Sequence, residues 1–174
     1  DENSLRLGHE NGLTAEEHAA LRRLLPRFAG MCAELAAYPF PETLNHGDMT
    51  DANVFLALRG DVFIDWGDAC VGHPFFSVRT PCVSVEVSFD LPENPPECDR
   101  LREAFLRPWT RFASRADVDQ AFSLGYRIGI VNGALNWRQA LTVGLPRERA
   151  EYLHAVPALL QEFLQVQTST EGAP

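Results

Sequence analysis

The chain has 174 residues, of which 45% are hydrophobic and 22% charged, and its formal net charge is -9. Its acidity argues against nucleic acid as a partner, because proteins that bind the phosphate backbone carry clustered Lys and Arg. No apolar run approaches the roughly 20 residues that a membrane span requires, so we expect a cytoplasmic protein with no membrane partner. An acidic surface also suits a cationic substrate, although solubility alone explains it.

Residues 1–13 are polar and are predicted to form a linker or a frayed entry. Thr14 and Glu17 then have the spacing of a capping box, followed by an apolar stripe with helical periodicity. We therefore expect a helix over residues 15–37. Pro26 should kink or divide it, because proline lacks a backbone donor and crowds the preceding turn.

Two short apolar runs, residues 54–58 and 62–64, are separated by Arg59-Gly60-Asp61 and predict a β-hairpin. The stretch from 72 to 96 contains five prolines, so any helix within it must be short or broken. Trp66, Phe75 and Phe76 could shape a pocket, but we expect them to pack in the core, as aromatic residues near a loop usually do.

Helical patterns return in three stretches: residues 98–113, residues 116–142, and from Pro146 to about Val166. Pro108 should interrupt the first, and Ser114 with Asp117 should cap the second. The fold class is therefore α+β and predominantly helical, with one lobe over residues 14–167. The tail 168–174 is small and polar, and is expected to be disordered.

All fifteen basic residues are arginines. Without lysine the chain holds neither a Walker-A loop nor a Schiff-base site. Four cysteines are widely spaced and form no C-x-x-C pair: Cys32, Cys70, Cys82 and Cys98. We expect them to be reduced, buried thiols.

Two acidic loops flank the predicted hairpin. Because a hairpin brings its outer ends together, Asn53 before the first strand and Asp65 after the second should lie side by side. They provide two oxygen ligands of the kind that Mg²⁺ prefers. Asp48, five residues before Asn53, is placed to accept or orient the proton of an attacking hydroxyl.

The run His46-Gly47-Asp48-Met49-x-x-x-Asn53 resembles the catalytic loop H-R-D-L-x-x-x-N of protein kinases, and Asp65-Trp66-Gly67 resembles their D-F-G. The glycine variant, with Gly72-His73-Pro74 shortly after, is similar to the aminoglycoside phosphotransferase family, which shares the kinase fold. The chain is identified as a member of that family by its C-terminal lobe only, a kinase-like lobe with a short catalytic β-hairpin.

The resemblance implies a phosphotransferase that moves the terminal phosphoryl group of ATP or GTP to a hydroxyl of a small molecule, with Mg²⁺ as cofactor. The acceptor would be aminoglycoside-like or another hydroxylated amine. It implies that Asp48 is the catalytic base, that His46 braces the loop, and that Asn53 and Asp65 hold the metal and nucleotide. Asp68 has a weaker claim to a role in the site.

The chain departs from the family in two places. His73 stands where the family often has Asp before Pro74, which could loosen a structural contact without touching catalysis. The family's first lobe supplies a glycine-rich loop, a phosphate-binding lysine and its glutamate partner, and this chain has no lysine. The N-terminal nucleotide lobe is therefore expected to be absent: the chain is a fragment of a longer parent or has lost activity.

Two alternatives stay open. One is a kinase-like module that binds a ligand or partner without catalysis. The other is a non-haem iron oxygenase in which His46 and Asp48 combine with His73 or His154, although this leaves the second acidic loop without a role.

Several other acidic residues have simpler explanations. Asp51 and Asp61 are expected to face water. A solvated helix face also explains five others better than an acidic rim for an amine substrate does: Glu103, Asp117, Asp119, Glu148 and Glu151.

Overall fold

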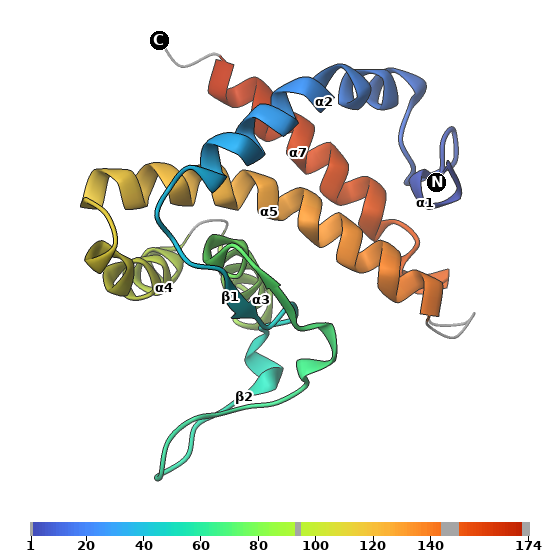
Figure 1. Cartoon of the computed structure of the whole chain (residues 1–174). Helices are drawn as coiled ribbons and strands as arrows, with labels where there is room; N and C mark the ends of the chain where they lie inside the picture. The colour runs from blue at the N-terminus through green and yellow to red at the C-terminus, as the bar shows by residue number, and fades with distance from the viewer. Residues whose placement is uncertain (1, 93–94, 144–149, 172–174) are drawn as a thin grey trace. The chain divides into compact units, whose positions relative to one another are not determined.

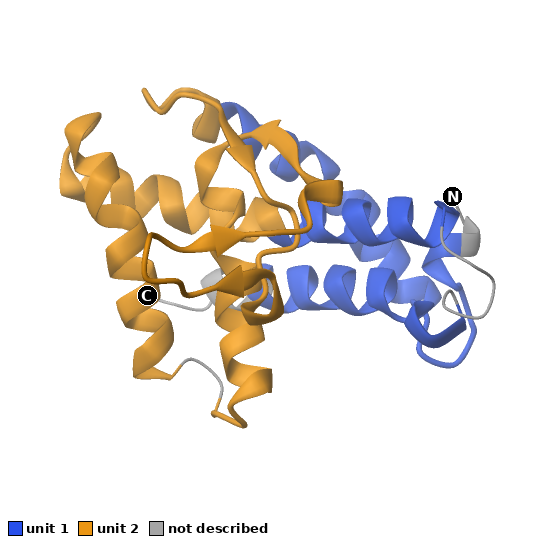
Figure 2. Ribbon diagram, turned by 90° about the horizontal axis from the view of Figure 1, so that it is seen from below, with its two compact units in different colours: residues 1–33, 130–174 blue, residues 34–129 orange. Residues whose placement is uncertain are grey.

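The structure is a computed structural model that describes residues 2–92, 95–143 and 150–171 (Figure 1). It is a mostly helical α+β chain with two small antiparallel sheets, as the sequence predicts. The chain divides into two compact units, one of residues 1–33 with 130–174 and one of residues 34–129 (Figure 2). The predicted lobe over 14–167 therefore contains parts of both units.

The first unit contains α1 (Glu2–Leu5) and α7 (Ala155–Glu171), which pack on each other. Leu13 is only 1% exposed, and Gln161 on α7 donates hydrogen bonds to the Gly12 carbonyl and to the Glu17 carboxylate. Residues 2–13, predicted as part of a linker or frayed entry, are thus folded, because burial of Leu13 and these contacts hold them.

Helix α2 (Ala15–Ala36) confirms the predicted helix and its capping box. The Thr14 amide donates to Glu17 Oε2 at 2.8 Å, and the Glu17 amide donates to Thr14 Oγ1 at 3.1 Å. The first of these bonds also lowers the pKa of the Glu17 carboxyl. Pro26 does not divide the helix, and burial of Met31 and Leu35 beyond it stabilises the second half.

The second unit contains both sheets. Strand β1 (Thr43–Asn45) pairs with β4 (Cys70–Gly72), and β2 (Val54–Phe55) pairs with β3 (Val62–Phe63). The β2–β3 pair confirms the predicted hairpin with shorter strands, and Gly60 at its turn has a φ of +121°. The β1–β4 pair was not predicted from the sequence.

Helix α3 (Arg79–Ser88) is short, as expected from the prolines around it. Helix α4 (Pro96–Leu106) ends before Pro108 and continues as a 3₁₀ turn, which confirms the predicted interruption. Helix α5 (Arg115–Val143) begins at the predicted cap, where the Asp117 amide donates to Ser114 Oγ at 3.2 Å.

The last predicted helix is described only in part. Its expected start at Pro146 lies outside the described residues. Helix α7 runs to Glu171, so residues 168–171 are helical rather than a disordered tail. None of the helices in the described ranges combines the length and hydropathy needed to span a bilayer.

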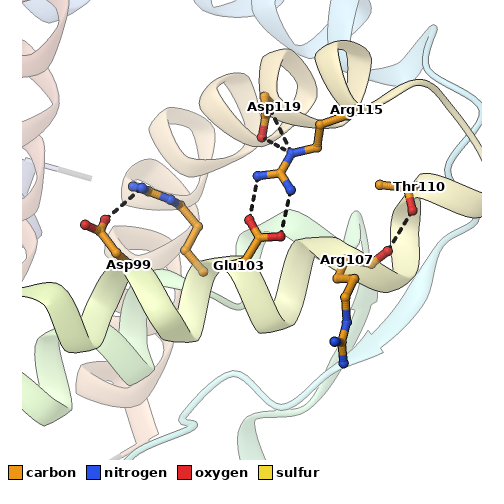
Figure 3. Close-up of polar contacts among 7 residues, drawn as sticks. Asp99, Glu103, Arg107, Thr110, Arg115 and Asp119 are labelled. Carbon is orange, nitrogen blue, oxygen red and sulfur yellow. Dashed lines mark hydrogen bonds and ion pairs between the residues drawn. The ribbon is translucent and has the colours of Figure 1, made fainter.

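An ion-pair network joins α4 to the start of α5 (Figure 3). Arg115 donates two parallel hydrogen bonds to the Glu103 carboxylate, at 2.7 and 2.6 Å. Its Nε also donates to Asp119 Oδ2 at 2.9 Å. The hydrogen bonds from Arg115 lower the pKa of Glu103. Both carboxylates are therefore engaged by the single guanidinium of Arg115, which offsets part of their negative charge.

Phe75 is the centre of the aromatic core of the second unit. It is 1% exposed, and its ring lies 5.0 Å from that of Phe40 and 5.8 Å from that of Trp109. On α5, a Cβ built at Gly125 would stand 2.7 Å from Phe75 Cβ. The expectation that Phe75 is core is confirmed, whereas Trp66 is 44% exposed because it lies in an open loop.

The contact between Gly125 and Phe75 predicts the outcome of adding one methyl group. Gly125→Ala should lower the free energy of unfolding by about 1 to 3 kcal/mol, because Phe75 must shift within a closely packed core. Gly30→Ala in α2 is the matched control, since no atom lies within 4 Å of its Cβ and alanine favours a helix by about 0.5 to 1 kcal/mol. Denaturant unfolding of both variants checks this. Equal changes in the two variants would contradict it.

Candidate functional site

Two loops, residues 46–53 and 64–69, are bracketed by the two sheets. Thr43 pairs with Gly72 at one end, and Val54 pairs with Phe63 at the other. Because the same two chain segments pair on both sides of the loops, the loops are forced to face each other. All of the site residues predicted from the sequence lie in these loops.

The side chains of Asp48 and Asn53 meet inside the first loop. Asn53 is 9% exposed, and its amide nitrogen donates to the Asp48 carbonyl at 2.8 Å and to Asp48 Oδ2 at 3.1 Å. These bonds direct the amide nitrogen toward Asp48 and leave the amide oxygen free of any hydrogen bond within the described chain. The carboxylate of Asp48 is thereby held in one orientation.

His46 connects the two loops. It is 2% exposed, and its Nε2 donates to the Ile64 carbonyl at 2.8 Å. The Ile64 amide in turn donates to the Asn53 carbonyl at 3.1 Å, and the ring of His46 lies 4.6 Å from that of Trp66. His46 therefore makes the kind of contact that a loop-bracing residue needs.

Asp65 directly follows Ile64 at the end of the hairpin. Its φ is 59°, a left-handed conformation that aspartate tolerates and that turns the chain sharply into a 3₁₀ turn at Trp66. Its carboxylate is exposed and makes no hydrogen bond or ion pair within the described ranges. A functional site is one setting in which such backbone strain is found.

Gly47 and Asp68 bring the two loops into backbone contact. Gly47 has a φ of +84°, and a Cβ built on it would stand 2.2 Å from the Asp68 carbonyl oxygen. Only glycine meets both conditions, since any side chain would be strained and would collide. Asp68 is therefore placed against the first loop by its backbone, while its side chain is exposed.

The donors at this site fit a magnesium ion held partly by phosphates. The free amide oxygen of Asn53 and the unpaired carboxylate of Asp65 are both oxygen ligands. Within the described residues, no three His, Cys, Asp or Glu side chains group into a metal site. One or two protein groups are enough where Mg²⁺ is also bound by the phosphates of a nucleotide.

Two of the histidines named for the iron oxygenase alternative have other contacts. His46 uses its Nε2 for the Ile64 carbonyl, and His73 lies among aromatic rings, 5.0 Å from Phe75 and 5.9 Å from Phe40. Neither histidine is grouped with a second histidine and a carboxylate within the described chain.

Burial keeps His73 neutral. It lowers the pKa of the imidazole from 6.5 to about 4. Nδ1 accepts a hydrogen bond from the Phe75 amide at 3.3 Å, which only an unprotonated Nδ1 can do. His73 thus caps the turn that carries Phe75 into the core.

Sequence reasoning missed one contact that positions the first loop. Asp51 is exposed, as expected, but its Oδ1 also accepts hydrogen bonds from Ser84 Oγ at 2.6 Å and Ser88 Oγ at 2.9 Å, and these lower its pKa. The Asp51 amide also donates to Ser84 Oγ at 2.9 Å. The spacing of the two serines, one helical turn apart, was the available signal.

A second missed residue is Asn45. It is 4% exposed, donates to the Thr43 carbonyl at 3.2 Å, and accepts a hydrogen bond from Ser77. It anchors the end of β1 where the first loop begins.

A model of the phosphotransferase enzyme family matches residues 2–113 of the chain, which include both loops. No curated protein and no solved structure matches the chain. The match covers more than half of the sequence, so the chain belongs to the phosphotransferase enzyme family. Membership implies a kinase-like fold, and relatives in the family generally use ATP and Mg²⁺.

The contact at Gly47 predicts that alanine there is more harmful than backbone conformation alone explains. Gly47→Ala should destabilise the second unit by roughly 3 kcal/mol, from left-handed strain plus the collision with Asp68. Gly8→Ala is the control: its φ is also positive, at +72°, but nothing lies within 4 Å of its Cβ, so its cost should be about 1 kcal/mol. Thermal or urea unfolding measures the difference, and similar losses would contradict the close approach of the loops.

The lowered pKa of His73 predicts a loss of stability in weak acid. The unfolded chain binds a proton at this histidine near pH 6.5 and the folded chain only near pH 4, so unfolding becomes easier as pH falls through this window. From pH 7 to 5 the loss should be roughly 1 to 2 kcal/mol. His73→Asn keeps an acceptor for the Phe75 amide but does not titrate, so it should show a shallower dependence. Parallel pH profiles for the two proteins would disprove the assignment.

Proposed function

We propose that the chain is the catalytic-loop lobe of a Mg²⁺-dependent phosphotransferase that moves the terminal phosphoryl group of ATP or GTP to a hydroxyl of a small molecule. The observation that carries the proposal is the Asp48–Asn53 hydrogen bond, made directly beside the strand end that bears Asp65. The carboxylate of Asp48 is oriented, the amide oxygen of Asn53 is free, and the carboxylate of Asp65 is unpaired, all within the same pair of loops.

Each residue has a distinct part in the proposal. Asp48, fixed by the Asn53 amide through one oxygen, uses its other oxygen to orient the acceptor hydroxyl and take its proton. Asn53 and Asp65 hold Mg²⁺, which offsets the negative charge of the phosphates when bound. His46 keeps the loops together, and the exposed Asp68 has a secondary role in the site.

The acceptor we propose is a hydroxylated amine. Asp68 is exposed in the loop that faces the oriented Asp48, and the net charge of the chain is -9. A cationic substrate is attracted to such a surface, whereas an anionic one is repelled.

We further propose that a nucleotide-binding lobe covers the β2–β3 hairpin. The chain has no lysine to contact the phosphates, so that group must come from elsewhere. In Figure 1 the hairpin projects away from β1 and α3. It exposes an apolar surface formed by Phe55, Leu56, Leu58, Val62, Phe63 and Ile64. Soluble proteins rarely leave so many large apolar side chains together in water unless a partner covers them.

A non-catalytic, kinase-like binding module is the second candidate. The absence of lysine favours it, since the phosphates lack their usual cation. Calorimetric titration of the 174-residue chain with Mg²⁺-ATP and Mg²⁺-GTP separates the candidates when combined with a turnover assay. Binding without turnover, even after a nucleotide lobe is supplied, would favour the module.

The catalytic proposal predicts that Asp48→Asn lowers kcat at least about 100-fold, because the acceptor hydroxyl loses its base. Asp61→Asn, in the exposed hairpin turn, should leave kcat unchanged. The assay follows phosphoryl transfer from Mg²⁺-ATP or Mg²⁺-GTP to a panel of hydroxylated amines, using a protein that joins the chain to a nucleotide lobe. Turnover by Asp48→Asn close to that of the unmodified protein would overturn the assignment.

A further inference from the structure

Two of the four cysteines lie against each other in the second unit. Cys82 is in the first turn of α3 and Cys98 in the first turn of α4. Cys82 Sγ lies 4.0 Å from the Cys98 carbonyl oxygen, and Cys98 Sγ lies 3.6 Å from the Cys82 carbonyl oxygen. Each sulfur therefore lies against the backbone of the other cysteine, on neighbouring helices. The pKa of each thiol is also affected by the other thiol.

The surroundings of the pair differ from those of the other cysteines. Cys98 is 8% exposed and Cys82 is partly exposed, so an oxidant reaches Cys82 first. Cys32 and Cys70 have no thiol partner within the described residues. Only the pair on α3 and α4 therefore has a nearby sulfur to complete an oxidation.

We propose that Cys82 and Cys98 form a reversible disulfide that fastens α3 to α4 when the protein meets a peroxide. The Cys82 thiolate attacks a peroxide oxygen, the O–O bond breaks and hydroxide leaves, which gives a sulfenic acid at Cys82. The Cys98 sulfur then attacks the Cys82 sulfur, the S–O bond breaks, and the departing hydroxide takes the Cys98 proton. Two thiols and one peroxide become one disulfide and two waters.

The disulfide forms slowly at neutral pH. Burial raises the pKa of both thiols, that of Cys98 to about 12, so few thiolates are present. The charged groups that face the pair act in both directions: Glu86, whose Oε1 accepts from Cys98 Sγ at 3.6 Å, and Asp99 raise the pKa of Cys82, whereas Arg102 lowers it. As long as the pH is below the thiol pKa, the rate of disulfide formation should increase about tenfold for each unit by which the pH is raised.

The consequence reaches the first loop through α3. Ser84 and Ser88 follow Cys82 on the same helix and hold Asp51 by hydrogen bonds. Fastening α3 to α4 therefore restrains the helix to which the 46–53 loop is tied. This inference does not depend on phosphoryl transfer, so it stands or falls separately from the proposed function.

The test treats the full chain with hydrogen peroxide at pH 8 and digests it with an Arg-specific protease. Cleavage after Arg79 and Arg100 leaves both cysteines in the peptide 80–100. Its mass should fall by two hydrogen atoms and return after reduction with dithiothreitol. A second cut after Glu86 should leave two peptides joined only by the disulfide. The Cys32→Ser/Cys70→Ser double variant should behave like the original, and Cys82→Ser should not form the link.

A stability measurement checks the fastening itself. The linked chain should melt roughly 5 °C above the reduced chain, because the bond restricts the unfolded state. The control is Cys98→Ser, or Cys98→Ala if the serine variant does not fold. Peroxide should not raise the melting temperature of this control. Sulfinic acid at Cys82, a link to Cys32 or Cys70, or thiols that stay free after prolonged treatment would overturn the proposal. So would a linked chain that melts no higher than the reduced one.

Discussion

The site depends on one constraint: two short antiparallel ladders pair the same two chain segments on either side of a gap. The two acidic loops are the stretches that lie between the β1–β4 pair and the β2–β3 pair. Hydrogen bonds then cross the gap, from His46 to the Ile64 carbonyl and from the Ile64 amide to the Asn53 carbonyl. Every proposed role in phosphoryl transfer follows from this bracket, because it brings polar side chains distant in sequence into one place.

The sequence was most informative where local chemistry decides the structure. The capping box at Thr14, the cap at Ser114 and the interruption at Pro108 depend on residues a few positions apart, and all were predicted correctly. The hairpin was also found, because two apolar runs around a glycine turn leave few alternatives. These features need no knowledge of the rest of the chain.

Features that depend on distant partners were missed. β1 and β4 are three residues each, too short to show an alternating pattern, and their pairing joins Thr43 to Gly72 across the hairpin. Asp51 is at the surface as predicted, but its hydrogen bonds were missed because its partners stand 33 and 37 positions away on α3. Trp66 was assigned to the core on residue type alone, yet it is 44% exposed beside His46. The placement of Asp48, Asn53 and Asp65 in facing loops was predicted, while their roles remain predictions.

The β2–β3 hairpin has one more consequence. Two strands of two residues each leave their outer backbone amides and carbonyls unpaired, and such a ribbon is only marginally stable alone in water. It is anchored at its base by Asn53 and Ile64, but no atom approaches within 4 Å of a Cβ built at Gly60 near its tip. Its amides should therefore exchange with solvent deuterium long before those of α4 or α5, and its bare edges offer a template to which another extended segment can add.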